Sequence, residues 1–327
     1  MRSYINKQVL LIAPVLYNYH LILSDAITKN GGQVTFIPER RYNTIFVSLK
    51  YLSRHIQTAY SNDHLRKKIA KAVSEKKFDT VILIRGERIT LKILQLVKKA
   101  NPRARFIYYQ WDSFRENPNA ANIYRFFDKV FTFDRNDSRE KKLNYLPLFY
   151  SNENRSGSSP SEPIKYDLVF VGGDHTDRYT IVKKLRKNLT AQNKQFHVRL
   201  VTTKLSLAKK KLLYRKKFGR INDNDFVTTP FSPDQIAALM KQSIAILDIN
   251  NPVQSGLTMR TIETLAMGKK IVTTNPFIQY EPFYNPGQIL VIDRENCAVP
   301  GTFFTDQQFE NTVKHLEVNR WVNYLIQ

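Results

Sequence analysis

Short apolar runs alternate with amphipathic stretches along almost the whole chain. The runs in the first half are rich in β-branched and aromatic residues, which is typical of buried strands, and the stretches between them have helical periodicity. Alternation of this kind predicts a parallel sheet with helices on both faces. The predicted strands are 8–13, 33–37, 79–84, 105–110 and 129–133, and the predicted helices lie near 18–30, 44–76, 90–100, 119–127 and 135–143.

A polar segment, residues 151–165, divides this pattern into two. It is rich in Ser, Asn, Pro and Glu and nearly free of aliphatic side chains, as linkers are. The alternation then restarts, with strands predicted at 166–173, 196–203, 225–230, 243–249, 270–275 and 288–293 and helices near 177–192, 205–215, 233–241 and within 255–269. We therefore expect a Rossmann-like domain at 1–150, the linker at 151–165, a second Rossmann-like domain at 166–304 and a closing helical segment at 305–327.

The length and composition agree with two globular domains. The chain has 327 residues and one cysteine, Cys297, so an intrachain disulfide is excluded, which fits a reducing cytoplasm. No apolar run is long enough to span a bilayer. Residues 8–13 are interpreted as the first strand, with a signal peptide as the alternative.

The formal net charge of +23 is the unusual property of the composition. Residues 1–150 contain 27 Lys and Arg against 12 Asp and Glu, and the remainder contains 24 against 16. A field of this size favours polyanionic partners, namely nucleic acid, an anionic membrane or phosphorylated glycans, although a well-solvated lysine-rich surface is the alternative. The sequence contains no recognisable nucleic-acid-reading module.

Ligands of open α/β sheets bind beyond the carboxyl ends of the strands, so residues there are the first candidates. In the first half, His20, Glu87 and Asp112 follow predicted strands. In the second half, Gly172 and Gly173 end a strand and Arg178 follows at the next helix. Glycines let a backbone approach a phosphate at a helix start, but a tight turn without a ligand explains them almost as well.

The segment 255–275 contains a charged pair beside its apolar stripe. The stripe consists of Met259, Ile262, Leu265 and Ala266, while Gly256, Arg260 and Glu263 are predicted to lie on another face of the helix. A guanidinium there could bind a diphosphate, and a carboxylate one turn deeper could accept hydrogen bonds from ribose hydroxyls. The alternative is a surface ion pair that contributes only about 0.2–0.5 kcal/mol.

Five segments resemble one family of enzymes, in the order in which that family has them. They are "VILIRGERIT", "FIYYQWDSFRENPN", "FDKVFTFDRNDSREKKLNYLPLFY", "YDLVFVGGDHTDRY" and "SGLTMRTIETLAMGKKIVTTN". The chain resembles GT-B glycosyltransferases, and more narrowly the bacterial CgeB-like group of lipopolysaccharide and capsule biosynthesis. The resemblance implies an α/β GT-B fold, with two Rossmann-like domains that face each other across a cleft.

The resemblance also implies which substrate each domain binds and which residues form the donor site. The second domain would bind the nucleotide sugar and the first the acceptor. Glu263 would bind ribose, and Arg260 and the Gly172–Gly173 turn would face the diphosphate, with Arg178, Ser255, Gly256 and Thr258 as further donor-binding residues. Many retaining enzymes have an acidic residue where this chain has Ser255, so the stereochemical class stays open.

An inverting transferase needs a carboxylate or His within reach of the acceptor hydroxyl. Asp112 is the first candidate, Glu87 the second and His20 the third. Asp112 could instead cap a helix or turn, and Glu87 could form a structural pair with Arg85.

We expect no metal site and no cofactor. Asp223 and Asp225 match the D-x-D pattern that holds divalent metals in other transferases, but they precede a predicted strand and are interpreted as a turn. The His residues lack the spacing of zinc ligands.

The basic segment 49–73 mixes apolar and cationic residues, so it could lie against an anionic membrane or form ordinary surface helices.

We expect a metal-independent glycosyltransferase that uses a nucleoside diphosphate sugar. UDP is the expected nucleotide, and a hexose is the expected sugar. The acceptor would be an anionic or lipid-linked surface glycan, and the enzyme would be cytoplasmic, free or peripheral on the inner membrane. The alternatives are a nucleic-acid-binding protein and a catalytically silent nucleotide-sugar binder.

Overall fold

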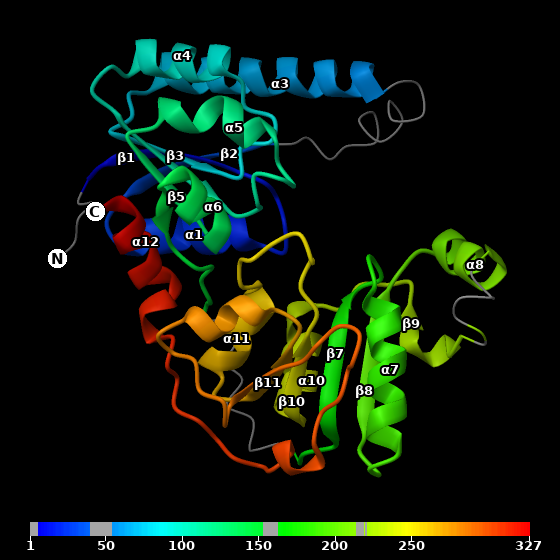
Figure 1. Ribbon diagram of the computed structural model, residues 1–327. Helices are drawn as coiled ribbons and strands as arrows, with labels where there is room; N and C mark the ends of the chain where they lie inside the picture. The colour runs from blue at the N-terminus through cyan, green and yellow to red at the C-terminus, as the bar shows by residue number, and fades with distance from the viewer. Residues whose placement is uncertain (1–5, 40–53, 153–162, 214–218, 220) are drawn as a thin grey trace. The chain divides into compact units, whose positions relative to one another are not determined.

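The computed structural model describes residues 6–39, 54–152, 163–213, 219 and 221–327, which form two compact units (Figure 1). The first unit consists of Met1–Phe149, Val253–Gly256 and His315–Gln327, and the second of Tyr150–Pro252 and Leu257–Lys314. The chain thus passes from one unit to the other near residue 150, while two later segments belong to the first unit. Most of the predicted linker lies outside the described residues.

The first unit contains a parallel six-stranded sheet with the order β2-β1-β3-β4-β5-β6. Its strands are β1 (Gln8–Ala13), β2 (Gln33–Pro38), β3 (Thr80–Ile84), β4 (Arg105–Gln110), β5 (Lys129–Thr132) and β6 (Asn144–Tyr145). Its helices are α1 (Tyr19–Lys29), α3 (Arg54–Glu75), α4 (Leu91–Ala100), α5 (Asn119–Ile123), the 3-10 helix η1 (Tyr124–Phe126), α6 (Arg135–Lys141) and α12 (Val318–Ile326).

Helices cover both faces of this sheet: α3, α4 and α5 lie on one face and α1 and α12 on the other (Figure 1). The C-terminal helix α12 joins the first unit through Trp321, which is 1% exposed. Its indole N–H donates to the Pro147 carbonyl at 2.8 Å, and its ring lies 4.7 Å from that of Tyr109. Burial of so large a side chain, with its polar atom satisfied, stabilises the docking of α12.

The second unit contains a parallel six-stranded sheet with the order β12-β11-β10-β7-β8-β9. Its strands are β7 (Tyr166–Gly173), β8 (Phe196–Val201), β9 (Phe226–Val227), β10 (Ser243–Asp248), β11 (Lys270–Thr273) and β12 (Ile289–Val291). Its helices are α7 (Arg178–Thr190), α8 (Lys204–Leu213), α10 (Pro233–Lys241) and α11 (Met259–Ala266), with the 3-10 helices η3 (Asp223–Asp225), η4 (Pro276–Tyr280) and η5 (Gly301–Phe303). The 3-10 helix η6 (Lys314–Leu316) spans the position at which the chain returns to the first unit.

Two such sheets confirm the predicted fold class. In each sheet the strand order reverses direction at one point, between β1 and β3 in the first unit and between β7 and β10 in the second. Connections leave in opposite directions at such a point, so the carboxyl ends of the two strands frame an opening where ligands bind. None of the helices in the described residues is both long enough and apolar enough to cross a membrane.

Candidate functional site

A buried carboxylate fixes the start of α11 at the carboxyl end of β10. Asp248, the last residue of β10, is 5% exposed and accepts a hydrogen bond from the Thr261 hydroxyl at 2.7 Å. Burial raises the pKa of Asp248, while hydrogen bonds from Thr261 and Thr258 oppose that rise. Thr258 also caps α11 by accepting from the Thr261 backbone N–H at 3.2 Å. The helix therefore starts at the point where the strand order of the second unit reverses.

The charged pair of α11 forms as the spacing predicts. Arg260 Nη1 lies 3.3 Å from Glu263 Oε2 and 3.0 Å from the sulfur of Met240 on α10. The Glu263 side chain is 25% exposed, and burial raises its pKa while Arg260 opposes the rise. A half-buried carboxylate whose charged form is disfavoured is a candidate for binding a ligand with hydroxyl donors.

Gly256 does not share this helical face, so that part of the sequence prediction is wrong. The helix begins only at Met259, because Thr258 is extended and caps it. Ser255 and Gly256 belong to the first unit, where Asp134 accepts from the Ser255 N–H at 2.7 Å, the Ser255 hydroxyl at 2.6 Å and the Gly256 N–H at 3.2 Å. A Cβ at Gly256 would come within 2.3 Å of Phe133. These contacts explain both small residues structurally.

Arg178 connects the carboxyl ends of β7 and β10. It is the first residue of α7, and its guanidinium donates to the Gly173 carbonyl at 3.0 Å and to the Ile249 carbonyl at 2.9 and 3.2 Å. Gly172 and Gly173 form the end of β7, as predicted. Arg178 thus stabilises the turn from which a ligand could be contacted, and it brings a positive charge there.

The sequence analysis missed Arg294, which follows β12. Its guanidinium binds both oxygens of Asp177, at 2.8 and 2.7 Å, and the backbone and side-chain oxygens of Asn250, at 2.6 Å each. Arg294 therefore connects the loops after β12, β7 and β10. Arg294 directly follows the predicted strand 288–293, so its place beyond a strand end is a usable signal in the sequence.

In the first unit the structure brings two of the three predicted catalytic residues together. Arg85 Nε lies 2.7 Å from Asp112 Oδ2, and Arg85 Nη2 lies 2.9 Å from Glu87 Oε2. The Asp112 and Glu87 side chains are 28% and 26% exposed. Burial raises the pKa of Asp112, and the Arg85 charge opposes that rise. Glu87 follows β3, which flanks the reversal point of this sheet, and Asp112 follows the neighbouring β4, so both carboxylates lie at the ligand-binding edge and suit proton transfer.

The loop that carries Arg85 is strained and firmly anchored. Arg85 and Gly86 have positive φ, 72° and 69°. For Arg85 this left-handed conformation costs on the order of 1–2 kcal/mol. The Arg85 carbonyl accepts from the Tyr108 hydroxyl at 2.6 Å and the Asn117 amide at 2.7 Å. Strain that the surroundings maintain in this way clusters at functional sites.

His20 takes no part in the ion pairs of Arg85 with Asp112 and Glu87. Its ring packs 4.9 Å from that of Phe36, and burial lowers its pKa. The neighbouring Tyr19 contacts Trp111 edge to face, with ring centroids 6.3 Å apart. Tyr19 thus packs against the residue that precedes Asp112 in the sequence.

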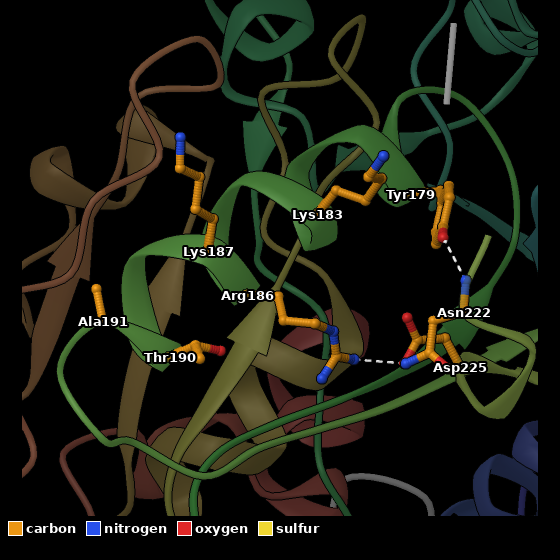
Figure 2. Close-up of a pocket in the computed structure, with 8 residues that line it drawn as sticks. All are labelled: Tyr179, Lys183, Arg186, Lys187, Thr190, Ala191, Asn222 and Asp225. Atoms are coloured by element: carbon orange, nitrogen blue, oxygen red, sulfur yellow. Dashed lines mark hydrogen bonds and ion pairs between the residues drawn. The ribbon is translucent and has the colours of Figure 1, made fainter. Parts of the chain in front are cut away.

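Asp223 and Asp225 form a 3-10 turn, as predicted, and each pairs with a cation. Asp225 contacts Arg186 and Asp223 contacts Lys211. Arg186 and Asp225 also line a cavity of about 560 Å³ along α7, where they point toward each other (Figure 2). This cavity contains no residue from the turns after β7 or β10. Among the residues that the structure describes, no three His, Cys, Asp or Glu side chains group as metal ligands would.

Solved structures of low sequence identity share this fold over their full length. A glycosyltransferase from Rickettsia africae is 13% identical, with 99% of this chain and 97% of that chain covered and a TM-score of 0.62. A UDP-forming α,α-trehalose-phosphate synthase from Burkholderia vietnamiensis is 10% identical, with 100% and 99% covered and a TM-score of 0.63. A UDP-GlcNAc 2-epimerase from Methanocaldococcus jannaschii is 12% identical, with 98% of each chain covered and a TM-score of 0.58.

These similarities define the class of fold. The chain has the GT-B fold, which glycosyltransferases and UDP-GlcNAc 2-epimerases share. No protein-family model matches the chain, and no curated protein matches it.

The carboxylate of Asp137 holds the backbone of the loop that follows Asp112, and a pH-dependent stability measurement tests this role. Its carboxylate accepts from the Phe114 N–H at 2.8 Å, and burial raises its pKa from 3.8 to about 6. The folded protein therefore binds this proton more tightly than the unfolded chain, and ionisation lowers stability as pH rises between those two values. We expect Asp137→Asn to raise the melting temperature, relative to wild type, more at about pH 7.5 than at about pH 4. A difference between variant and wild type that does not change with pH would contradict this account.

Proposed function

We propose that the protein is a glycosyltransferase that transfers a hexose from a nucleoside diphosphate donor, with UDP as the expected nucleotide, to a surface glycan. The second unit binds the donor and the first unit binds the acceptor. The observation that carries the proposal is the Arg260–Glu263 pair on α11, at the reversal point of the donor-binding sheet in a chain of GT-B fold. The acceptor class, a lipopolysaccharide or capsule glycan, rests on the resemblance to the CgeB-like group.

The donor is bound by charge and by hydroxyl recognition. Glu263 accepts hydrogen bonds from the two ribose hydroxyls, which compensates for its burial. Arg260 and the backbone of the Gly172–Gly173 turn face the diphosphate, and the guanidinium of Arg178 beside that turn adds positive charge. As the sugar leaves, negative charge grows on the diphosphate, and nearby fixed positive charge stabilises that transition state.

The acceptor is activated in the first unit. Asp112 takes the proton of the acceptor hydroxyl as the acceptor oxygen bonds to the anomeric carbon. The bond from that carbon to the diphosphate oxygen breaks, and the nucleoside diphosphate leaves with the electron pair. Arg85 orients Asp112 and Glu87 through the two ion pairs, so it is a positioning residue.

Epimerisation is the second candidate, because a 2-epimerase shares the fold at a similar TM-score. Incubation with UDP-GlcNAc distinguishes the two: a transferase or its hydrolytic side reaction releases UDP and keeps the configuration at C2 of the sugar. Appearance of the C2 epimer would support epimerisation instead.

Separate titrations with UDP, GDP and duplex DNA test the remaining alternatives. Tight DNA binding without nucleotide binding would favour a nucleic-acid-binding protein. Nucleotide binding without turnover of any donor would indicate a silent binder.

Glu263→Gln should weaken UDP binding about 10- to 100-fold, because the charged acceptor of two hydroxyl hydrogen bonds is lost. Its melting temperature should stay nearly unchanged, since burial disfavours the charged form in the free protein. Isothermal titration measures the affinity. Glu295→Gln is the matched control, because that side chain is 92% exposed in the same unit. Wild-type affinity in Glu263→Gln would refute the ribose assignment.

Asp112→Asn should lower the turnover number about 100- to 10,000-fold, the range for loss of a general base, while UDP affinity in the other unit is kept. Glu116→Gln, an exposed neighbour, is the control and should retain activity. Glu87→Gln should have a smaller effect than Asp112→Asn. A larger loss in Glu87→Gln would move the role of base from Asp112 to Glu87.

We further propose that transfer needs no divalent metal. The two carboxylates of the D-x-D match already pair with Arg186 and Lys211, and cationic side chains lie near the proposed diphosphate position. Turnover should therefore persist in excess EDTA, measured as UDP release. Loss of turnover in EDTA that Mn²⁺ restores would overturn this, and Asp223→Asn and Asp225→Asn would then identify the ligands.

A further inference from the structure

Helix α8 exposes an apolar face that no described residue of its own unit covers. None of its residues, Lys204–Leu213, is buried. Leu205, Leu212 and Leu213 are 67%, 79% and 67% exposed, and no other large hydrophobic side chain in the described residues is more exposed. Figure 1 shows α8 at the margin of the second unit, beyond α7. Isolated exposed leucines are ordinary, but three on one short helix form a patch.

The spacing places these leucines together. Leu205 and Leu212 are seven residues apart, so they lie on the same side of the helix two turns from each other. Ala208 lies one turn from both and is also exposed. Leu213 and the exposed Lys209 border this side. We call Leu205, Ala208, Leu212 and Leu213 the leucine face of α8.

The opposite side of α8 is anchored, so the leucine face has a fixed direction within the unit. Leu207 packs against the core cluster of the second unit. Lys210 contacts Asp174 at the end of β7, and Lys211 lies 2.6 Å from Asp223. With one side bound in this way, the helix cannot turn its leucines inward without breaking both ion pairs.

The charges indicate what covers the leucine face. Helix α8 contains no acidic residue, and Lys204 and Lys209 are exposed beside the leucines. The whole chain has a net charge of +23. A partner with an apolar interior and a negative surface matches both properties, and an anionic phospholipid bilayer is such a partner.

We propose that α8 lies on an anionic membrane, with its leucine face in the boundary between headgroups and acyl chains and its lysines at the headgroups. The sequence favours the segment 49–73 for membrane contact, but the described part of α3 exposes a smaller apolar surface than α8. The apolar residues Leu65, Ile69 and Val73 of α3 are buried in the core. Three of its cations, Arg66, Lys67 and Lys71, pair with acidic residues of the same helix. The proposal does not depend on the glycosyltransferase assignment.

Co-sedimentation of the full chain with vesicles tests the proposal. Wild type should bind phosphatidylcholine vesicles that contain about 30% phosphatidylglycerol and release as salt rises, because a Debye length shortens to about 8 Å at physiological ionic strength. The triple variant Leu205→Gln, Leu212→Gln and Leu213→Gln should bind at least about tenfold more weakly. Leu91→Gln, at a 43% exposed leucine of the first unit, is the matched control and should bind as wild type does.

Three outcomes would overturn the proposal. They are no binding of wild type to anionic vesicles, equal binding of the triple variant and wild type, and loss of a dimer in the triple variant, which would show that a second copy covers the leucine face.

A second measurement does not depend on the folding of the triple variant. Leu212→Cys can be labelled with a polarity-sensitive fluorophore, because the native Cys297 is buried. Its emission should shift to shorter wavelength with anionic vesicles, and the same label in Leu91→Cys should not respond. An unchanged emission of labelled Leu212→Cys on vesicles that bind the protein would place the contact elsewhere and refute the proposal.

Discussion

The candidate donor site depends on one buried carboxylate, Asp248. Burial of a carboxylate is costly unless hydrogen bonds compensate it, and Thr258, which caps α11, and Thr261 on its first turn supply them. The start of α11 is therefore fixed against the end of β10. Because Arg260 and Glu263 lie on α11, this also fixes their positions. Without Asp248 the apolar stripe of α11 would still pack, but nothing equivalent would set where the charged pair lies relative to the strand end.

In the first unit, hydrogen bonds fix the position of Arg85 in a comparable way. Its left-handed backbone is unfavourable, and hydrogen bonds from Tyr108 and Asn117 to its carbonyl maintain it. The guanidinium then orients two carboxylates from neighbouring strand ends. In both units, therefore, polar groups at the reversal point of a parallel sheet fix charged side chains in place before any ligand arrives. Such preorganisation lowers the cost of binding and of transition-state stabilisation.

The sequence predicted the strands well because parallel strands buried on both faces are continuous apolar runs, as in residues 79–84 and 105–110. It also predicted the Arg260–Glu263 pair, which depends only on helical spacing. It did not predict Gly256, because the helix start is set by the cap at Thr258. Nor did it identify Asp248, although an acidic residue in an apolar strand was a usable signal. Contacts such as Arg294 with Asp177 depend on chain segments far apart in sequence, so spacing alone cannot reveal them.

The central claim is that α11 and the turn after β7 form a nucleotide site. Hydrogen–deuterium exchange of the full chain, with and without saturating UDP, tests it most directly. The account predicts slower exchange in residues 258–266 and 172–178 when UDP is bound, and weaker slowing in Glu263→Gln at the same UDP concentration. Unchanged exchange in both segments, while UDP binds and protects another part of the chain, would contradict it.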